Sequence, residues 1–262
     1  MMQTANVERA AEILWGCWRN GQVIDALPAH CTPATRSEGY AVQSEFDRLS
    51  GQSRVGWKIA ATSLAGQRHI GVDGPLLGRI LASRVYRSGA RISITANRMR
   101  VVEPEFAFRF GRTLVPRLMP YSVDEVMAAV DSLHLTLEMP DSRFADFAHA
   151  GGPSLIADNA CAHELVLGEK VTADWRRIDL SRHPVEASVA SRYNRSGSGA
   201  NVLGDPRVAL TWCVNELSAL GIPMSNDEFV TTGTSVIPLE VVPGDHVSAD
   251  FGLLGRIEVQ IA

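Results

Sequence analysis

The segment VVEPEFAFRFG, residues 101–111, carries two carboxylates that could bind a cation. Successive side chains of a strand point to opposite faces, so Glu103 and Glu105 share one face, and the phenylalanines occupy the other. Residues two apart in a strand are separated by about 7 Å, so carboxylates lining a cavity repel unless one protonates or a cation lies between them. Such oxygen ligands suit Mg²⁺, Mn²⁺ or Ca²⁺. If the face meets water instead, the pattern is that of an ordinary amphipathic strand.

A third carboxylate lies in the segment HLTLE, residues 134–138. Alternation places Glu138 on one face with His134 and Thr136, at the end of a strand just before Pro140. A side chain at a strand end often projects into a cleft, where it could join an oxygen site around one divalent ion and leave positions open for substrate. The alternative is a glutamate in bulk water.

Lys58, in the segment VGWKIAA, is a candidate proton-transfer residue. Its neighbours on the same strand face are Gly56 and Ala60, whose small side chains leave room beside the amine. A lysine in a half-buried strand is expected to have a lowered pKa, which suits a proton-transfer group. The competing interpretation is an edge-strand lysine that discourages aggregation.

Three glycine-rich segments are less specific. SGSGANVLGDP, residues 196–206, lacks a complete GxGxxG pattern, so it indicates a loop more strongly than a dinucleotide site. TTGTS, residues 231–235, could present backbone N–H groups to a carboxylate, although a turn is the simpler interpretation. GVDGPLLG, residues 71–78, predicts a turn-rich loop with its bend at Asp73 and Gly74.

The elements that position these residues change in character along the chain. The first fifty residues predict two helices, one capped by Asn6 and ending near Gly21, and one from Thr35, which fits a capping box, to Gly51. Two later helices are predicted, one from a capping box at Ser122 through apolar positions to Leu133, the other from Asp205-Pro206 to Gly221. Short strands are predicted at Arg54–Ala60, Arg84–Ile94, Val101–Phe110, His134–Glu138, Val185–Tyr193, Glu228–Thr232, His246–Ala249 and Arg256–Ile261.

Helices followed by a strand-rich body favour an α+β fold over a regular βαβ alternation. We therefore expect a helical segment of residues 1–52 packed on a β-rich body of residues 53–262, and length alone allows one large domain or two small ones.

Composition limits the possible classes of function. The chain has 262 residues, with 25 Lys and Arg against 29 Asp and Glu, which argues against nucleic-acid binding. Its apolar runs are far shorter than the ~20 residues that span a bilayer, and its N-terminus is unlike a secretion signal. Its cysteines and histidines show no CxxC, HxH or HExxH spacing, so we expect free thiols and no zinc site. These features predict a cytoplasmic protein with no nucleic-acid or membrane partner.

Taken together, several segments resemble the 2-keto-4-pentenoate hydratase / 2-oxo-3-hexenedioate decarboxylase family, within the fumarylacetoacetase superfamily. In chain order they are GWKIAATS, GVDGPLLG, VEPEFAF, LEMPDSR, ADNACA, GSGANVLGDP, VTTGTS and PGD. Each is unspecific alone, but the ordered combination is specific and extends from roughly residue 5 to the C-terminus.

The resemblance implies a single catalytic domain, residues 1–262, with a mixed β-sandwich or roll flanked by helices, assembled into a homo-oligomer. It implies a Mg²⁺ or Mn²⁺ cofactor and a small 2-oxo acid as substrate. The implied metal ligands are Glu103, Glu105 and Glu138, and the implied active-site lysine is Lys58. The motif match also suggests substrate-binding residues: Ser63, Thr232 and Gly233.

The leading hypothesis is a metal-dependent hydratase that adds water to 2-hydroxypenta-2,4-dienoate through an enolate, in aromatic-compound catabolism. Hydratases of this family commonly carry an aspartate where this sequence has Leu76. Decarboxylation of a 2-oxo-3-hexenedioate-type diacid and hydrolysis of an acylpyruvate C–C bond therefore stay open. Two further alternatives are a Schiff base on Lys58 and a non-catalytic homologue whose carboxylates bind a structural cation or nothing.

Overall fold

The computed structural model describes residues 2–262, which form six α-helices and thirteen β-strands. The helices are α1 Thr4–Asn20, α2 Arg36–Ser50, α3 Leu64–His69, α4 Val123–Met127, α5 Gly152–Ala157 and α6 Pro206–Ala219. The strands are β1 Arg54–Ala60, β2 Leu76–Leu81, β3 Val85–Arg87, β4 Arg91–Ile92, β5 Val101–Phe110, β6 Val130–Met139, β7 Glu164–Lys170, β8 Pro184–Val189, β9 Tyr193–Ser198, β10 Phe229–Thr234, β11 Leu239–Glu240, β12 His246–Asp250 and β13 Arg256–Ile261.

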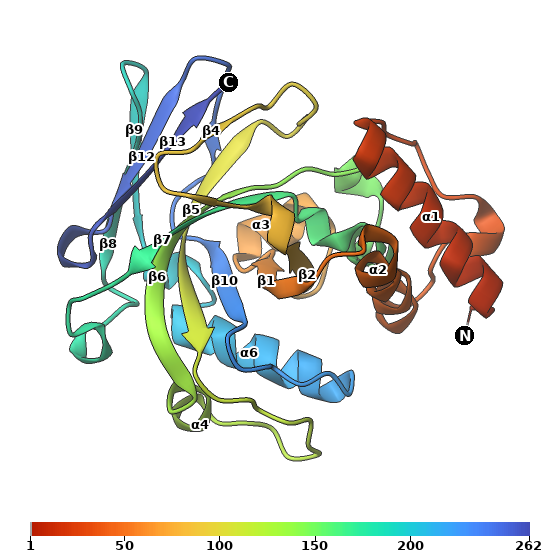
Figure 1. Ribbon diagram of the computed structural model, residues 1–262, viewed down its shortest axis with the longest axis horizontal. Helices are drawn as coiled ribbons and strands as arrows, with labels where there is room; N and C mark the ends of the chain where they lie inside the picture. Colours follow the sequence, from red (N-terminus) through yellow and green to blue (C-terminus); the bar gives the residue numbers. More distant parts are fainter. Residues whose placement is uncertain (1) are drawn as a thin grey trace.

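The strands form two sheets. The larger follows the order β2-β1-β10-β5-β6-β7-β3, with β11 added beside β5, and the smaller follows β4-β13-β12-β8-β9. Both are mixed, because β1 and β10, β3 and β7, and β4 and β13 pair in parallel while their other pairs are antiparallel. Figure 1 shows the smaller sheet on one side of the molecule and the first two helices on the other. The predicted α+β fold is confirmed.

The main core joins both sheets and α6. Its centre includes the predicted phenylalanine face of β5, since Phe106, Phe108 and Phe110 are each 0% exposed. Phe106 also packs edge-to-face on Phe251 of the smaller sheet's β12–β13 connection, with ring centroids 5.1 Å apart. Burying a phenylalanine contributes about 1.5–3 kcal/mol. This apolar face therefore holds β5 in place and leaves its other face for polar groups.

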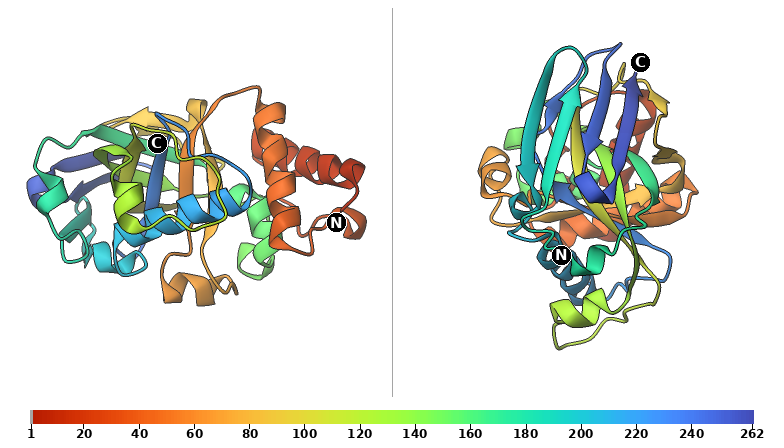
Figure 2. Two further views of the ribbon diagram at one scale, coloured as in Figure 1. Left: turned by 90° about the horizontal axis from the view of Figure 1, so that it is seen from below. Right: turned by 90° about the vertical axis from the view of Figure 1, so that its left-hand side faces the viewer.

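The first two helices build a core of their own. Leu14 and Trp18 of α1 pack with Phe46 of α2, and the cluster extends to Leu81 at the end of β2 and Ala157 at the end of α5. Figure 2 shows these helices at one end of an elongated molecule. Within residues 2–262, no helix combines the length and apolar composition needed to cross a membrane.

Helix α1 begins earlier than predicted. Asn6 was expected to be its N-cap, but the residue before the helix is Gln3, whose carbonyl accepts the Asn6 N–H at 2.9 Å. Asn6 therefore lies inside the first turn. Helix α2 begins after Thr35 as predicted, with the Thr35 hydroxyl accepting from the Glu38 N–H at 3.2 Å.

The predicted helix from Ser122 to Leu133 is wrong in its second half. Ser122 and Glu125 form the full capping box, but α4 ends at Met127 and Val130 starts β6. The apolar residues that suggested further helical turns instead pair with β5, as Leu133 does opposite Phe108. Pairing with β5 therefore determines the conformation of these residues, although their apolar spacing also fits a helix.

Four strands were not predicted. The segment predicted as a loop at residues 71–78 ends in β2, the predicted strand Val185–Tyr193 ends as β8 at Val189 with β9 beginning at Tyr193, and β7 and β11 were missed. The predicted strand Arg84–Ile94 is divided into β3 and β4, because Gly89 between them has φ 81°. The bounds of β1, β5 and β13 are those predicted.

Candidate metal centre and active-site cavity

Strands β5 and β6 bring the three predicted carboxylates together. In their antiparallel register Glu103 lies opposite Glu138, and Glu105 lies opposite Thr136. Carboxylate oxygens of Glu103, Glu105 and Glu138 all lie within 4.8 Å of one another. Figure 1 shows the two strands crossing the middle of the molecule, with β10 beside β5. The polar face opposite the phenylalanines thus gathers three oxygen donors at one point.

The cluster is largely hidden from solvent. Glu105 and Glu138 are 1% and 2% exposed, and Glu103 is half-buried. Burial raises the pKa of all three carboxyls because it disfavours their charged forms. For Glu105 the Glu103 charge adds to burial, and the pKa rises to about 8 although the Lys58 charge opposes this. A cation bound between the carboxylates would remove this repulsion.

Two of the carboxylates differ in how the chain satisfies them. One Glu105 oxygen accepts the Gly233 N–H at 2.8 Å and the Thr231 hydroxyl, which are both on β10. In contrast, the Glu138 Oε2 atom is buried with no hydrogen-bond partner among residues 2–262. An unpartnered buried oxygen of this kind costs about 1–3 kcal/mol or more. Hard oxygen donors and one unpartnered atom fit an ion such as Mg²⁺ or Mn²⁺.

Lys58 is buried beside this cluster, at 3% exposed. Its Nζ lies 3.5 Å from Glu138 Oε1 and donates to the Ala160 carbonyl at 3.2 Å. The expected lowering of its pKa is wrong. Burial does act to lower the Lys58 pKa, but the charges of Glu138 and then Glu103 outweigh it, so the pKa is raised. In these surroundings the amine is held in its ammonium form.

A cavity of about 680 Å³ opens beside Lys58 and Glu103. This volume is in the range of small-molecule sites. Its wall is mainly apolar, and includes Ile70, Leu76, Met99, Val101, Phe147 and Leu155. The cavity could therefore enclose a small acid whose polar end faces the carboxylate cluster.

The predicted substrate-binding residues do not all reach this cavity. Ser63 and Gly233 line it, and Ser63 also caps α3 by accepting the Gly66 N–H at 3.0 Å. Thr232 is not among its lining residues, because its hydroxyl donates to the Phe106 carbonyl at 3.0 Å and the residue is 0% exposed. Thr232 therefore holds β10 against β5.

Sequence reasoning missed two contacts of the cluster. Thr231, which donates to Glu105, shares a strand face with Gly233, so alternation along β10 could have identified it. The Ala160 carbonyl that accepts from Lys58 has no signal in the sequence, because any residue type carries that group.

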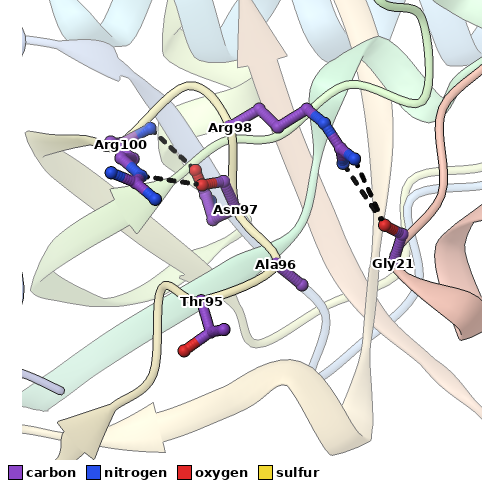
Figure 3. A pocket seen from close by; sticks show the side chains of 6 residues that line it. All are labelled: Gly21, Thr95, Ala96, Asn97, Arg98 and Arg100. Carbon is purple, nitrogen blue, oxygen red and sulfur yellow. Dashed lines mark hydrogen bonds between the residues drawn. The ribbon is translucent and has the colours of Figure 1, made fainter.

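A second hollow lies outside this site, between Gly21 and residues 95–100 (Figure 3). Among the described residues, those that line it include no carboxylate, cysteine or histidine. Figure 3 shows the Arg98 guanidinium directed to the Gly21 carbonyl, at 3.3 and 3.4 Å. Arg98 also lines the main cavity, but its charged end is engaged here.

Comparison with known proteins agrees with this geometry. No family model matches the chain. The 2-keto-4-pentenoate hydratase of Paraburkholderia xenovorans strain LB400 is 30% identical over 256 residues, which cover 97% of this chain and 94% of the relative. The chain belongs to the 2-keto-4-pentenoate hydratase / 2-oxo-3-hexenedioate decarboxylase family.

Members with either activity in their names are similar to this chain. The 4-oxalocrotonate decarboxylase of Pseudomonas putida is 27% identical over 230 residues, covering 86% of this chain and 85% of the relative. The solved structure of the 4-oxalocrotonate decarboxylase from Pseudomonas putida G7, complexed with magnesium and adipate, matches with a TM-score of 0.90. It is 24% identical and covers 100% of this chain and 99% of that chain, so this likeness shows that the family shares the fold.

Proposed function

We propose that this chain is a divalent-metal-dependent lyase that adds water to a small unsaturated 2-oxo acid of the 2-hydroxypenta-2,4-dienoate type. The observation that carries the proposal is the convergence of three carboxylates and Lys58 at one cavity. Hydration converts 2-hydroxypenta-2,4-dienoate and water into 4-hydroxy-2-oxopentanoate. The names of the relatives support this chemistry.

In this proposal Glu103, Glu105 and Glu138 hold Mg²⁺ or Mn²⁺. When bound, the ion supplies a Lewis acid that draws electrons from the C2 carbonyl of a 2-oxo acid. The chain's own contribution is to hold Glu105 by two hydrogen bonds from β10 and to leave the Glu138 Oε2 atom available.

Lys58 is the proposed proton-transfer residue. Its ammonium form donates a proton to a substrate carbon, and the resulting amine can withdraw one at the next step. The cavity wall excludes water from the rest of the substrate. Ser63 and Gly233 contact the substrate, and Thr232 holds β10, the strand of Gly233, against β5.

The wider properties of the protein belong to the same proposal. Residues 1–262 act as one catalytic domain, with residues 1–52 packed on the body of residues 53–262. The protein works in the cytoplasm as a homo-oligomer. Its apolar cavity and acidic cluster support a small-molecule partner.

Decarboxylation of a 2-oxo-3-hexenedioate-type diacid is the second candidate function. The observation that favours it is Leu76, which lines the cavity and is 1% exposed, so Glu103 is the one carboxylate among the described lining residues. No further carboxylate is then present to activate water. An apolar wall also favours loss of neutral CO2, because burial disfavours the departing carboxylate.

Hydrolysis of an acylpyruvate has weaker support. That reaction would be favoured by a carboxylate–histidine pair that activates water. The ring of His134 instead contacts the Ser132 hydroxyl at 3.1 Å and the Gly168 carbonyl at 2.9 Å. His69 lines the cavity and packs against the Phe147 ring.

The deciding experiment supplies Mg²⁺ and either 2-hydroxypenta-2,4-dienoate or 2-oxo-3-hexenedioate, and measures hydroxy-acid formation and CO2 release. We expect chelation to abolish turnover and Mg²⁺ or Mn²⁺ to restore it. The Leu76→Asp variant should raise hydration relative to decarboxylation. Full activity of Glu105→Gln would contradict the proposal.

Two controls separate the remaining alternatives. Borohydride trapping with pyruvate, followed by mass spectrometry, would reveal a Schiff base on Lys58. A thermal shift caused by Mg²⁺ but not further changed by oxalate would indicate a non-catalytic cation site.

A further inference from the structure

The turn that contacts Lys58 has an unusual backbone. Asn159, Ala160 and Cys161 have φ angles of 57°, 48° and 59°, so three consecutive residues other than glycine are left-handed. L-residues avoid this conformation because Cβ approaches the following carbonyl oxygen. Such a conformation persists only where its surroundings over-determine it.

Asn159 supplies one side of this constraint. Its side chain is 0% exposed and clamps the backbone of Arg79 on β2. The Oδ1 atom accepts the Arg79 N–H at 2.6 Å, and Nδ2 donates to the Arg79 carbonyl at 2.9 Å. The turn is thereby fixed to the strand that pairs with β1, the strand of Lys58.

Asp158 supplies the other side. Its carboxylate is 0% exposed and accepts from the Ser142 hydroxyl at 2.7 Å and from the Arg143 N–H at 2.9 Å. The Arg143 guanidinium also donates to this carboxylate and to the Asp158 carbonyl. The turn is therefore anchored to the segment that follows β6 as well as to β2.

These anchoring contacts fix the direction of the Ala160 carbonyl. The Ala160 carbonyl accepts from Lys58 Nζ at 3.2 Å, while Glu138 Oε1 lies 3.5 Å from the same nitrogen. An ammonium group has three N–H donors, so these partners leave one for the cavity. The turn also packs closely against β2. A Cβ added at Gly78, the residue of β2 that pairs with Lys58, would lie 2.3 Å from the Asn159 carbonyl oxygen.

We propose that Asn159 is a positioning residue for Lys58. By clamping the left-handed turn to β2 it aims the Ala160 carbonyl at the amine and so sets which N–H faces the substrate. The proposal rests on the proposed function, in which Lys58 transfers the proton. It adds a residue that touches neither substrate nor metal and acts through another side chain.

The main test is the Asn159→Gly variant, because glycine tolerates the left-handed backbone while the clamp is lost. We expect kcat to fall about 10-fold to 100-fold, as for a small misplacement of a reacting group. KM and the Mg²⁺-induced rise in Tm should stay close to those of the wild type, since the carboxylate cluster is unchanged. If Asn159→Gly does not fold, the isosteric Asn159→Asp variant replaces it in the same measurements. It keeps the Oδ1 acceptor and loses the Nδ2 donor.

The sequence allows a direct structural readout. Its two lysines are Lys58 and Lys170, and Lys170 is exposed in an ion pair with Asp131. NMR of protein labelled at lysine Cε should therefore give two signals. Asn159→Gly should displace the Lys58 signal and leave the Lys170 signal in place.

A matched control exists on α6. The Asn215 side chain makes the same clamp, accepting the Tyr121 N–H at 2.7 Å and donating to its carbonyl at 3.0 Å, but contacts another part of the chain. Asn215→Ala should keep kcat within about twofold of the wild type, since no reacting group is displaced. It should also leave the Lys58 signal unmoved.

The double variant with Lys58→Met distinguishes positioning from general damage. If Asn159 acts through Lys58, adding Asn159→Gly to Lys58→Met should cause no further loss of activity. Multiplicative losses, or an Asn159→Gly variant with wild-type kcat and an unmoved Lys58 signal, would overturn the proposal. Full activity of Lys58→Met would instead overturn the proposed function, and the NMR signal would still decide whether Asn159 positions the amine.

Discussion

Two buried carboxylates of this protein differ in how completely their oxygens are hydrogen-bonded. Asp158, 0% exposed, accepts hydrogen bonds from Ser142 and from the backbone and guanidinium of Arg143. Glu138, 2% exposed, has Lys58 near one oxygen and no hydrogen-bond partner for the other among the described residues. The chain compensates the first charge itself, whereas in the proposed function a metal ion completes the compensation of the second. Of these two carboxylates, only Glu138 keeps a buried oxygen that a bound cation could satisfy.

The largest expected effect comes from breaking the complete pair. Arg143→Ala leaves Asp158 buried without its cation, which should lower the free energy of unfolding by about 3–5 kcal/mol. Urea denaturation followed by circular dichroism measures the change. A loss below about 1 kcal/mol would show that the pair resembles a surface ion pair.

The next effect concerns metal affinity. Glu105→Gln should weaken Mg²⁺ binding at least about 100-fold, because even residues that only support metal ligands often contribute 10-fold to 100-fold. Isothermal titration calorimetry measures the affinity. Asp158→Asn is the matched control, since it alters a carboxylate outside the cluster, and its folded protein should bind Mg²⁺ as the wild type does.

A pH series tests the effect of burial and neighbouring charge on the carboxylate cluster. The Glu105 pKa is raised from 4.5 to about 8 on folding, so its contribution to stability is complete below pH 4.5 and lost as pH rises through 8. Lys58 does not add to this slope, because its pKa is raised above an already high 10.5. The Tm of the metal-free protein should fall between pH 5 and pH 8 relative to that of Glu105→Gln.

Mg²⁺ should remove most of that difference, since it stabilises the ionised cluster. The measurement is the Tm of both proteins across the pH range, with and without the ion. A metal-free wild type whose Tm rose relative to Glu105→Gln over this range would exclude a buried Glu105 with a raised pKa.

The smallest effect is expected at a surface pair. Arg177 and Asp174 lie 3.1 Å apart with side chains 87% and 64% exposed. Because water screens such pairs, Arg177→Ala should shift Tm by less than about 2 °C. A shift as large as that of Arg143→Ala would mean that burial does not decide the value of an ion pair here.

Local patterns predicted much of the site. Alternation along β5 separated the glutamates from the phenylalanines correctly, because it depends only on the two-residue period of a strand. That Glu138 lies opposite Glu103 depends on strand register, which one strand's sequence does not contain. The raised pKa of Lys58 was missed for the same reason, since its cause is the nearness of charges from other strands.

Other errors arose where local and distant preferences conflict. The apolar residues after α4 fit a helix, yet pairing with β5 draws Val130–Met139 into a strand. The left-handed turn at Asn159–Cys161 contains no glycine, and although asparagine tolerates that conformation, Ala160 and Cys161 give no sign of it. Its anchoring contacts to distant residues, among them Arg79 and Arg143, account for it.

The separate core of the first two helices has a consequence for heat inactivation. It packs on Leu81, at the end of the strand that holds the turn, and on Ala157, just before the turn itself. A cooperative opening of α1 and α2 would loosen both supports while the two sheets stayed folded. Activity should therefore disappear at a lower temperature than β-sheet structure, and amide hydrogen exchange should show α1 and α2 opening first.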